Sequence, residues 1–320
     1  MKNPPVAVGS AVMVSHASAV RPAGPLLGRA GAYVALTKPR IIELLLVTTL
    51  PTMIVAQRGL PRLSLVAATL VGGTLAAGGA NAVNMYVDRD IDRLMHRTEN
   101  RPLVTGTVTP PAALAFACAL EVAAFFELWS LVNLLSAALA LAATAFYVGV
   151  YTLWLKRRST QNIVVGGAAG AVPVLVGWAA VTGSLAWPPV VLFGVIFLWT
   201  PPHFWSLAVR YREDYAAAHV PMLPVVAPPR RISRNVFWYT AATVAVSIAF
   251  VPLAHMGITY TVVAAIAGAA YLAMAARLWV LTRRTSPIEA EAMRLFGYSI
   301  TYLTLLFGAM ALDVFVRRIH

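Results

Sequence analysis

Nine apolar runs, each about as long as a membrane-spanning helix, constrain the fold of this chain more than any other feature. They lie near residues 41–59, 63–85, 111–130, 132–154, 162–182, 189–209, 235–254, 258–280 and 295–316. An α-helix needs about 20 apolar residues to cross the roughly 30 Å hydrocarbon core of a bilayer. Hydrophobic residues make up 59% of the 320 residues and charged residues only 12%, a balance too apolar for a soluble fold. The sequence therefore predicts an all-α integral membrane protein with about nine transmembrane helices.

Basic residues are concentrated in alternate links between these runs. If the N-terminus is cytoplasmic, the inner segments 1–40, 86–110, 155–161, 210–234 and 277–294 hold 21 of the 25 Lys and Arg residues. Basic residues are retained on the cytoplasmic side during insertion. We therefore expect a multi-pass protein of the cell (inner) membrane, with its N-terminus and aspartate-rich loops in the cytoplasm. The net charge of +13 is then a topology signal and does not indicate a nucleic-acid partner.

The N-terminal segment differs from the rest of the chain. Residues 1–35 contain several Pro and Gly residues and no long apolar run, so we expect a flexible cytoplasmic tail there. A single transmembrane domain is expected over residues 36–320. Cys118 is the only cysteine, which excludes an intramolecular disulfide and a Cys-based metal site.

Two carboxylates and an amide follow the second apolar run at a spacing of four residues. Asn84, Asp88 and Asp92 would share one face of a helix, whereas Asp90 would point elsewhere. Mg²⁺ prefers oxygen ligands of this kind and often shares them with substrate phosphates. We therefore predict that Asn84, Asp88 and Asp92 bind magnesium and take part in catalysis on a phosphate-bearing substrate.

Arginines accompany these carboxylates. Arg89, Arg93 and Arg97 would form a second stripe at the same spacing, and Arg101 follows in the loop, so that several forked donors would face a diphosphate. The alternative is a helix end that carries only solvated charge. Asn81, which still lies within the apolar run, favours a functional site, because polar side chains are costly in lipid and usually face a bundle interior.

The aspartate segment resembles the first aspartate-rich motif of the UbiA superfamily of intramembrane prenyltransferases. Further segments are similar to one branch of it, the protohaem IX farnesyltransferases or haem O synthases. These segments are 36–40 with Glu43, 151–157, Asn162 with Gly166, Gly170, Pro173, Gly177 and Trp178, 199–205, 211–215 and 220–224. The similarity covers residues 36 to about 226, and the Pro-Pro-His and Pro-Met-Leu-Pro segments select the branch.

The resemblance implies a UbiA-type helical bundle with a central cavity and a Mg²⁺-dependent enzyme. Members of the branch transfer a farnesyl group from farnesyl diphosphate to a vinyl group of haem b, with addition of water, and so supply haem O for terminal oxidases. Farnesyl diphosphate and haem b would be the substrates, the lipid bilayer the surroundings, and a downstream haem-modifying enzyme a further partner.

Three alternatives remain open. Within the superfamily, the acceptor would be an aromatic or quinone precursor. A membrane transporter would normally show inverted repeats, and the sequence contains no clear repeat. A non-catalytic assembly factor for a haem-containing oxidase would not need the aspartate stripe, so the presence of that stripe opposes it.

The resemblance and the charge pattern also suggest roles for polar residues elsewhere. We expect the diphosphate to be bound by Lys38, Arg93, Arg97, Arg101, Lys156 and Asp214, and the haem by Asn162, His203, Arg157, Arg210 and Arg212. The alternative for Lys156, Arg157, Arg210 and Arg212 is that they only mark the cytoplasmic side of the membrane.

His203 follows Pro201 and Pro202 in the sixth apolar run. A proline pair disturbs helical hydrogen bonding and can open a polar pocket, so His203 is expected to be catalytic, either as a ligand of haem iron or in proton transfer. The alternative is a buried histidine that bonds a neighbouring helix.

Asp214 departs from the superfamily pattern. The second long inner segment commonly carries a D-x-x-x-D pair, but here Ala218 stands four positions after Asp214, which leaves a second magnesium ion short of ligands. We interpret the neighbouring His219 as a loop residue, and Glu121 and Glu127, which lie within an apolar run, as structural.

Overall fold

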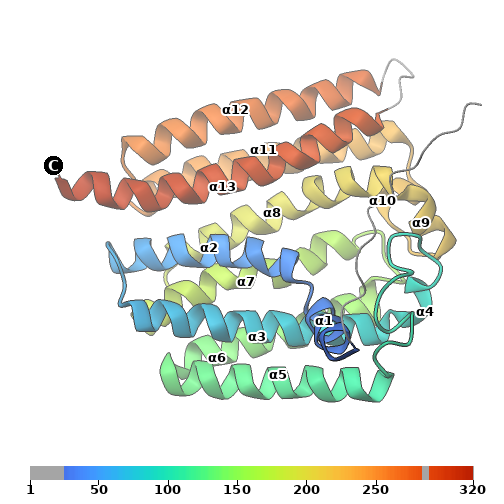
Figure 1. Ribbon diagram of the computed structural model, residues 1–320. Helices are drawn as coiled ribbons and strands as arrows, with labels where there is room; N and C mark the ends of the chain where they lie inside the picture. The colour runs from blue at the N-terminus through green and yellow to red at the C-terminus, as the bar shows by residue number, and fades with distance from the viewer. Residues whose placement is uncertain (1–24, 283–287, 320) are drawn as a thin grey trace, which may run out of the picture.

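The computed structural model describes residues 25–282 and 288–319, and all regular elements in this part of the chain are helical (Figure 1). Eight helices in these residues are long and apolar enough to cross a membrane. They are α3 (Leu63–Val87), α5 (Pro110–Leu131), α6 with η1 (Leu134–Ala145 and Phe146–Leu155), α7 (Asn162–Thr182), α8 (Trp187–Arg210), α11 (Pro229–Leu253), α12 (Ile258–Leu281) and α13 (Glu289–Ile319). With α2 (Pro39–Gln57), whose segment Val47–Gln57 is apolar, these helices confirm the prediction of about nine.

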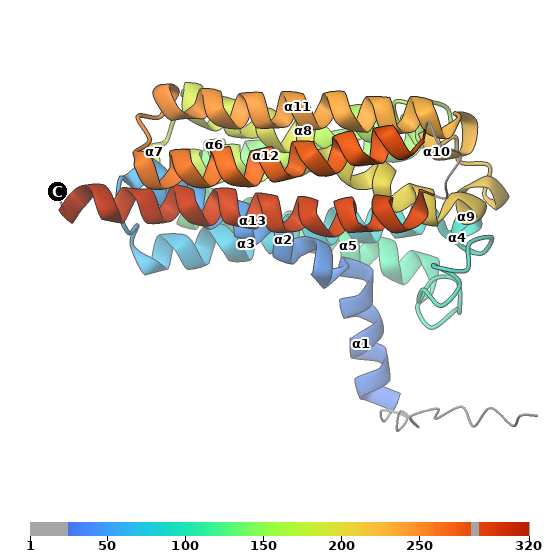
Figure 2. The same cartoon turned by 90° about the horizontal axis from the view of Figure 1, so that it is seen from above.

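The long helices lie side by side in one bundle (Figures 1 and 2). On one side of the bundle α5 packs against α3 and α6, and on the other side α8, α11, α12 and α13 enclose the largest apolar core. Contacts of α7 with α8, and of α2 with α7 and α13, join the two sides. Polar side chains such as Thr52, Asn81 and Asn162 are buried between helices, whereas large apolar side chains such as Phe126 and Ile266 are exposed on the outside of the bundle, as expected for a surface that faces lipid.

The short helices α4 (Arg89–Asp92), α9 (Arg212–Ala217) and α10 (Leu223–Val226) all lie at one end of the bundle (Figures 1 and 2). The inner segments 86–110 and 210–234 therefore meet. Ile91 and Tyr215, from α4 and α9, belong to the same apolar cluster.

A helix, α1 (Pro25–Thr37), occupies part of the segment expected to be a flexible tail, and it projects from the side of the bundle (Figure 2). Residues 1–24 lie outside the described residues. The chain turns between α1 and α2 at Lys38, which adopts a left-handed conformation with φ of 55°. The domain boundary at residue 36 stays a prediction.

The fourth apolar run ends in a π-helix. α6 continues directly into η1, where the wider turn lets Lys156 N–H donate to Tyr151 O at 2.8 Å. Thr152 Oγ donates to Tyr147 O at 2.9 Å within the same turn. π-Helical turns are rare in proteins, and those that occur are often found at functional sites. Because η1 changes the angular spacing of its residues, it sets the direction in which Thr152 and Lys156 point.

Replacement of Gly166 by alanine should destabilise the contact between α7 and η1. A Cβ atom at Gly166 would lie 2.3 Å from Cδ2 of Tyr151, whereas a Cβ atom at Gly170, one turn further along α7, would meet nothing within 4 Å. We expect G166A to lower the free energy of unfolding by about 1–3 kcal/mol. G170A is the matched control, and it should be neutral or slightly stabilising, because alanine favours helix over glycine. Thermal unfolding of the purified protein in detergent measures both, and equal stability of the two variants would contradict this packing.

Candidate active site

Asp88 lies at the C-cap of α3, where the helix ends at Val87. The helical hydrogen bonds continue across this break, since Asp88 N–H donates to Asn84 O and Asp92 N–H donates to Asp88 O, both at 2.9 Å. Asn84, Asp88 and Asp92 are 2%, 0% and 1% exposed. Asn84 Nδ2 donates to Asp88 Oδ2 at 2.8 Å, so the first two residues of the predicted stripe touch directly. The predicted spacing thus holds despite the change of helix.

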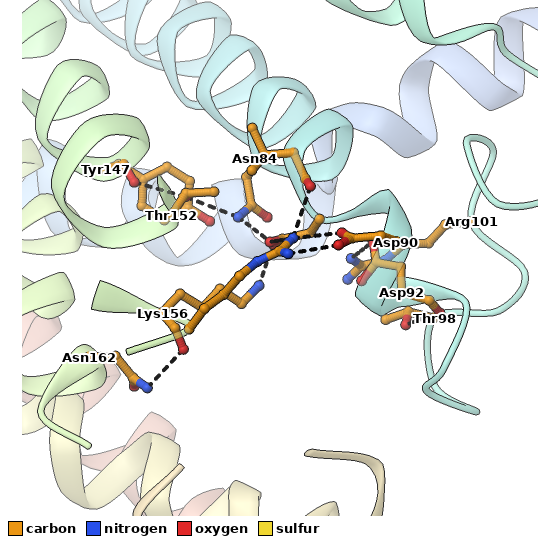
Figure 3. Close-up of polar contacts among 12 residues, drawn as sticks. Asn84, Asp90, Asp92, Thr98, Arg101, Tyr147, Thr152, Lys156 and Asn162 are labelled. Atoms are coloured by element: carbon orange, nitrogen blue, oxygen red, sulfur yellow. Dashed lines mark hydrogen bonds and ion pairs between the residues drawn. The ribbon is translucent and has the colours of Figure 1, made fainter. Parts of the chain in front are cut away.

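Three cationic side chains from different segments converge on this polar stripe, and two of them, Arg101 and Lys156, are labelled in Figure 3. Lys156, at the end of η1, forms an ion pair with Asp88 Oδ2. Arg101 Nη1 lies 2.6 Å from Asp92 Oδ2. Lys38 Nζ donates to Asn84 Oδ1 at 2.7 Å. The structure therefore brings together Lys38, Arg101 and Lys156, which the sequence had nominated for a diphosphate.

These cations are crowded. Burial lowers the pKa of Lys38 to about 7, and the nearby charges of Arg101 and Lys156 act in the same direction. Positive charges packed this closely repel one another, and an anion between them would relieve that repulsion. The geometry therefore suits a polyanionic substrate such as a diphosphate.

Two carboxylate oxygens in the site have no hydrogen-bond partner. They are Asp88 Oδ1 and Asp92 Oδ1, both buried. Buried carboxylate oxygens are costly unless a cation or donor satisfies them, and Mg²⁺ takes such oxygens together with substrate phosphates and water. The described residues contain no group of three or more His, Cys, Asp or Glu that would enclose a metal on its own. The donor set therefore fits a magnesium ion that the protein holds by Asp88 and Asp92 and the substrate completes.

Asn84 bridges the site. Its amide oxygen accepts from Lys38, and its amide nitrogen donates to Asp88 and, at 3.1 Å, to Thr152 Oγ. These contacts orient Asp88, and the role of Asn84 as a metal ligand stays a prediction. Thr152, which is fully buried here, was not among the residues predicted for the site. The wide turn of η1 brings it to Asn84, and a hydrophobic pattern does not reveal a π-helix.

Asp90 points away from the site, as predicted, and is 60% exposed. Arg157 donates to its two carboxylate oxygens at 2.7 and 2.6 Å and to Val87 O at 3.1 Å. The hydrogen bonds from Arg157 lower the pKa of Asp90. Arg157 therefore holds the corner between α3 and α4, beside an open hollow of about 380 Å³ lined by Val87, Arg89, Asp90, Thr152, Leu153 and Arg157. Its expected contact with haem stays a prediction.

The predicted arginine stripe is wrong, because α4 ends at Asp92 and the chain leaves the helical path. Arg89 turns back to Tyr86, where it donates to the carbonyl oxygen at 2.6 Å and lies over the ring. Arg93 is exposed. Arg97 lies over Tyr211 and Tyr215, with 5.1 and 5.2 Å from its Cζ to the ring centroids.

The candidate haem residues are placed in two regions. Asn162 is buried beside the site, where its Nδ2 donates to Lys156 O at 3.4 Å and its Oδ1 has no partner among the described residues. Arg210 and Arg212, at the end of α8 and the start of α9, are exposed at the same end of the bundle. His219 is an exposed loop residue in a left-handed conformation, with φ of 53°.

His203 is buried in α8, with its ring stacked on Trp199 and Phe296. Its Nδ1 lies 2.7 Å from Ser299 Oγ, and the hydroxyl of Ser299 donates to Phe296 O at 2.6 Å. If the serine proton is used in that bond, Nδ1 would be the donor of the pair and Nε2 would carry the lone pair. That tautomer suits both ligation of a metal through Nε2 and a purely structural histidine.

The comparisons with known proteins agree with this fold. A protein-family model described as "UbiA prenyltransferase family" matches residues 45–315. The chain is 57% identical to a protein named protoheme IX farnesyltransferase from Renibacterium salmoninarum, over 89% of this chain and 90% of that one. It is 56% identical to a protein of the same name from Frankia alni, over 89% of this chain and 98% of that one.

Solved structures share the fold at low identity. A structure described as digeranylgeranylglyceryl phosphate synthase superposes with a TM-score of 0.73 at 16% identity, over 89% of this chain and 98% of that one. A UbiA homolog from Archaeoglobus fulgidus bound to GPP and Mg²⁺ superposes with a TM-score of 0.60 at 16% identity, over 87% of this chain and 99% of that one.

Proposed function

The chain belongs to the UbiA prenyltransferase family, and we propose that it transfers a farnesyl group from farnesyl diphosphate to a vinyl group of haem b, with addition of water, to give haem O. The observation that carries the proposal is the buried pair Asp88 and Asp92, each with one unsatisfied oxygen and each paired with a cation. Identity of 57% and 56% to two proteins named protoheme IX farnesyltransferase supports haem b as the acceptor.

The residues of the site suit ionisation of an allylic diphosphate. Lys38, Arg101 and Lys156 would donate to the diphosphate oxygens and stabilise the negative charge that develops as the carbon–oxygen bond breaks. Bound Mg²⁺, held by Asp88 and Asp92, would supply Lewis-acid stabilisation of the same leaving group. The apolar helices around the site would keep water from the allylic cation until the vinyl group attacks.

Haem b would bind with its propionates toward the cytoplasmic end of the bundle. Arg210 and Arg212 are exposed there and can pair with carboxylates. The amide nitrogen of Asn162, which makes only a 3.4 Å contact with Lys156 O, would donate to a propionate. His203, further along α8, would contact the haem through Nε2. The chain would lie in the cell membrane with its N-terminus in the cytoplasm, and the product would pass to a downstream haem-modifying enzyme.

The test of the acceptor compares two substrates. The purified protein is supplied with farnesyl diphosphate and Mg²⁺, together with either haem b or a hydroxybenzoate, and release of diphosphate is measured with each. The proposal predicts that haem b stimulates release and that the aromatic acid does not. Stimulation by the aromatic acid alone would favour the quinone-type alternative.

Removal of divalent metal should abolish prenyl transfer. Because Asp88 and Asp92 would then face the diphosphate without a bridging cation, we expect the rate to fall by at least about 100-fold after chelation and to return with added Mg²⁺. The rate is measured before chelation, after it and after the addition of metal. An unchanged rate in the chelated protein would exclude the metal.

A further inference from the structure

We propose that Asp214 is a positioning residue that fastens the loop after α4, residues 93–109, over the active site, and that it is not a metal ligand. This inference rests on the proposed function, because the loop carries Arg101, which pairs with Asp92 in the diphosphate site. In this role Asp214, in segment 210–234, needs no second carboxylate at position 218.

The contact that fastens the loop is made to its backbone. Asp214 Oδ2 accepts from Arg97 N–H at 3.2 Å, a bond between segments 117 positions apart in sequence. The guanidinium of Arg97 continues the contact, since its Nη2 donates to Tyr215 Oη at 3.1 Å and its charge lies over the rings of Tyr211 and Tyr215. Backbone and side chain of one loop residue are thus both held by α9 and the residue before it.

An apolar cluster lies behind this contact. Met95 from the loop packs with Tyr215, Val220 and Met222 of the second inner segment. Ala218, four positions after Asp214, is 5% exposed within the same cluster. A carboxylate at position 218 would take the place of a side chain that is buried in this apolar cluster. The position that would complete a second metal pair is therefore used for packing.

Arg97, the residue that Asp214 holds, is close in sequence to residues that contact Asp92. Thr98, next to Arg97, donates from Oγ to Asp92 O at 2.8 Å. Arg101, three residues further on, donates from Nη1 to Asp92 Oδ2 at 2.6 Å. Release of Arg97 would free the segment that places Arg101 on the carboxylate.

A hydrogen bond to a backbone N–H needs only an acceptor, whereas a carboxylate that binds Mg²⁺ holds it much more weakly once the negative charge is removed. An asparagine at position 214 keeps an oxygen acceptor and loses the charge, and an alanine loses both. The two substitutions therefore separate the two roles. Glu213, which is adjacent and exposed, offers the matched control E213A.

Two measurements test the proposal. The first is the rate of tryptic cleavage after Arg93, Arg97 and Arg101 in the purified protein without substrates, which reports how often the loop opens. We expect D214A to be cleaved about tenfold faster than the parent and D214N within about threefold of it. The second is the Mg²⁺ concentration that gives half-maximal prenyl transfer, which should be unchanged in D214N and E213A.

The outcomes are distinct. Cleavage of D214A at the parent rate would overturn the role of Asp214 in holding the loop. A raised Mg²⁺ requirement in D214N, with activity as low as in D214A, would show that the residue serves a metal. Because cleavage is measured without haem or farnesyl diphosphate, a failure of the proposed function would leave that result intact.

Discussion

Replacing Asp88 with asparagine should lower the rate of prenyl transfer by about 100- to 1,000-fold, the largest effect we expect from any single substitution in the chain. Asp88 is fully buried, pairs with Lys156, and keeps one oxygen without a hydrogen bond, 3.9 Å from Nη2 of Arg157. The amide preserves the shape of the side chain and removes the charge that a magnesium ion and Lys156 both require. The rate is measured with farnesyl diphosphate and haem b at saturating Mg²⁺.

The matched control is Glu99→Gln. It is the same chemical change in the loop that follows α4, at a residue whose side chain is 49% exposed and lies 3.4 Å from His96 Nδ1. We expect its rate to stay within about twofold of the parent, since an exposed pair of this kind contributes little. If D88N were as active as E99Q, Asp88 would have no part in the chemistry.

Replacing Lys156 with methionine should lower the rate of prenyl transfer by about 100-fold. The side chain of Lys156 is 14% exposed and pairs with Asp88 Oδ2. Methionine keeps much of its length, but it leaves the buried carboxylate with only the more distant Arg157, at 3.9 Å, and the diphosphate without a donor. Arg158→Met is the control, because Arg158 is exposed at the same end of the bundle, two residues later.

The double variant D88N/K156M gives a sharper result. When two groups act as a unit, replacing both lowers the rate by less than the product of the fold-reductions that the two single replacements cause. We therefore expect the double variant to be within about tenfold of D88N. A rate equal to the product of the two losses would show that Lys156 and Asp88 act independently, and an unchanged rate in K156M would remove Lys156 from the site.

The sequence predicted the helices and the carboxylates well. The length of a membrane-spanning helix is set by the bilayer, so runs of about 20 apolar residues locate the helices with little ambiguity. The spacing of Asn84, Asp88 and Asp92 also held, since hydrogen bonds from Asp88 and Asp92 continue the helical pattern past the end of α3. Local periodicity was sufficient for both.

Other parts of the site depend on features that a pattern does not record. The arginine stripe failed because α4 ends after one turn, and Arg97 instead contacts α9 far along the chain. Thr152 was missed because η1 is a π-helix, which alters the direction of each side chain. Lys38 reaches Asn84 only because the chain turns at a left-handed residue between α1 and α2. These contacts come from tertiary packing and special backbone conformations.

The most direct test of prenyl transfer to haem b is to analyse the product. The purified protein is incubated with haem b, farnesyl diphosphate and Mg²⁺, and the haem is extracted and its mass measured, with D88N prepared in parallel. We expect the parent protein to yield a haem that carries one hydroxyethylfarnesyl group, and D88N to yield almost none of this product. Recovery of unmodified haem b alone from the parent protein, or equal yields from the two proteins, would contradict it.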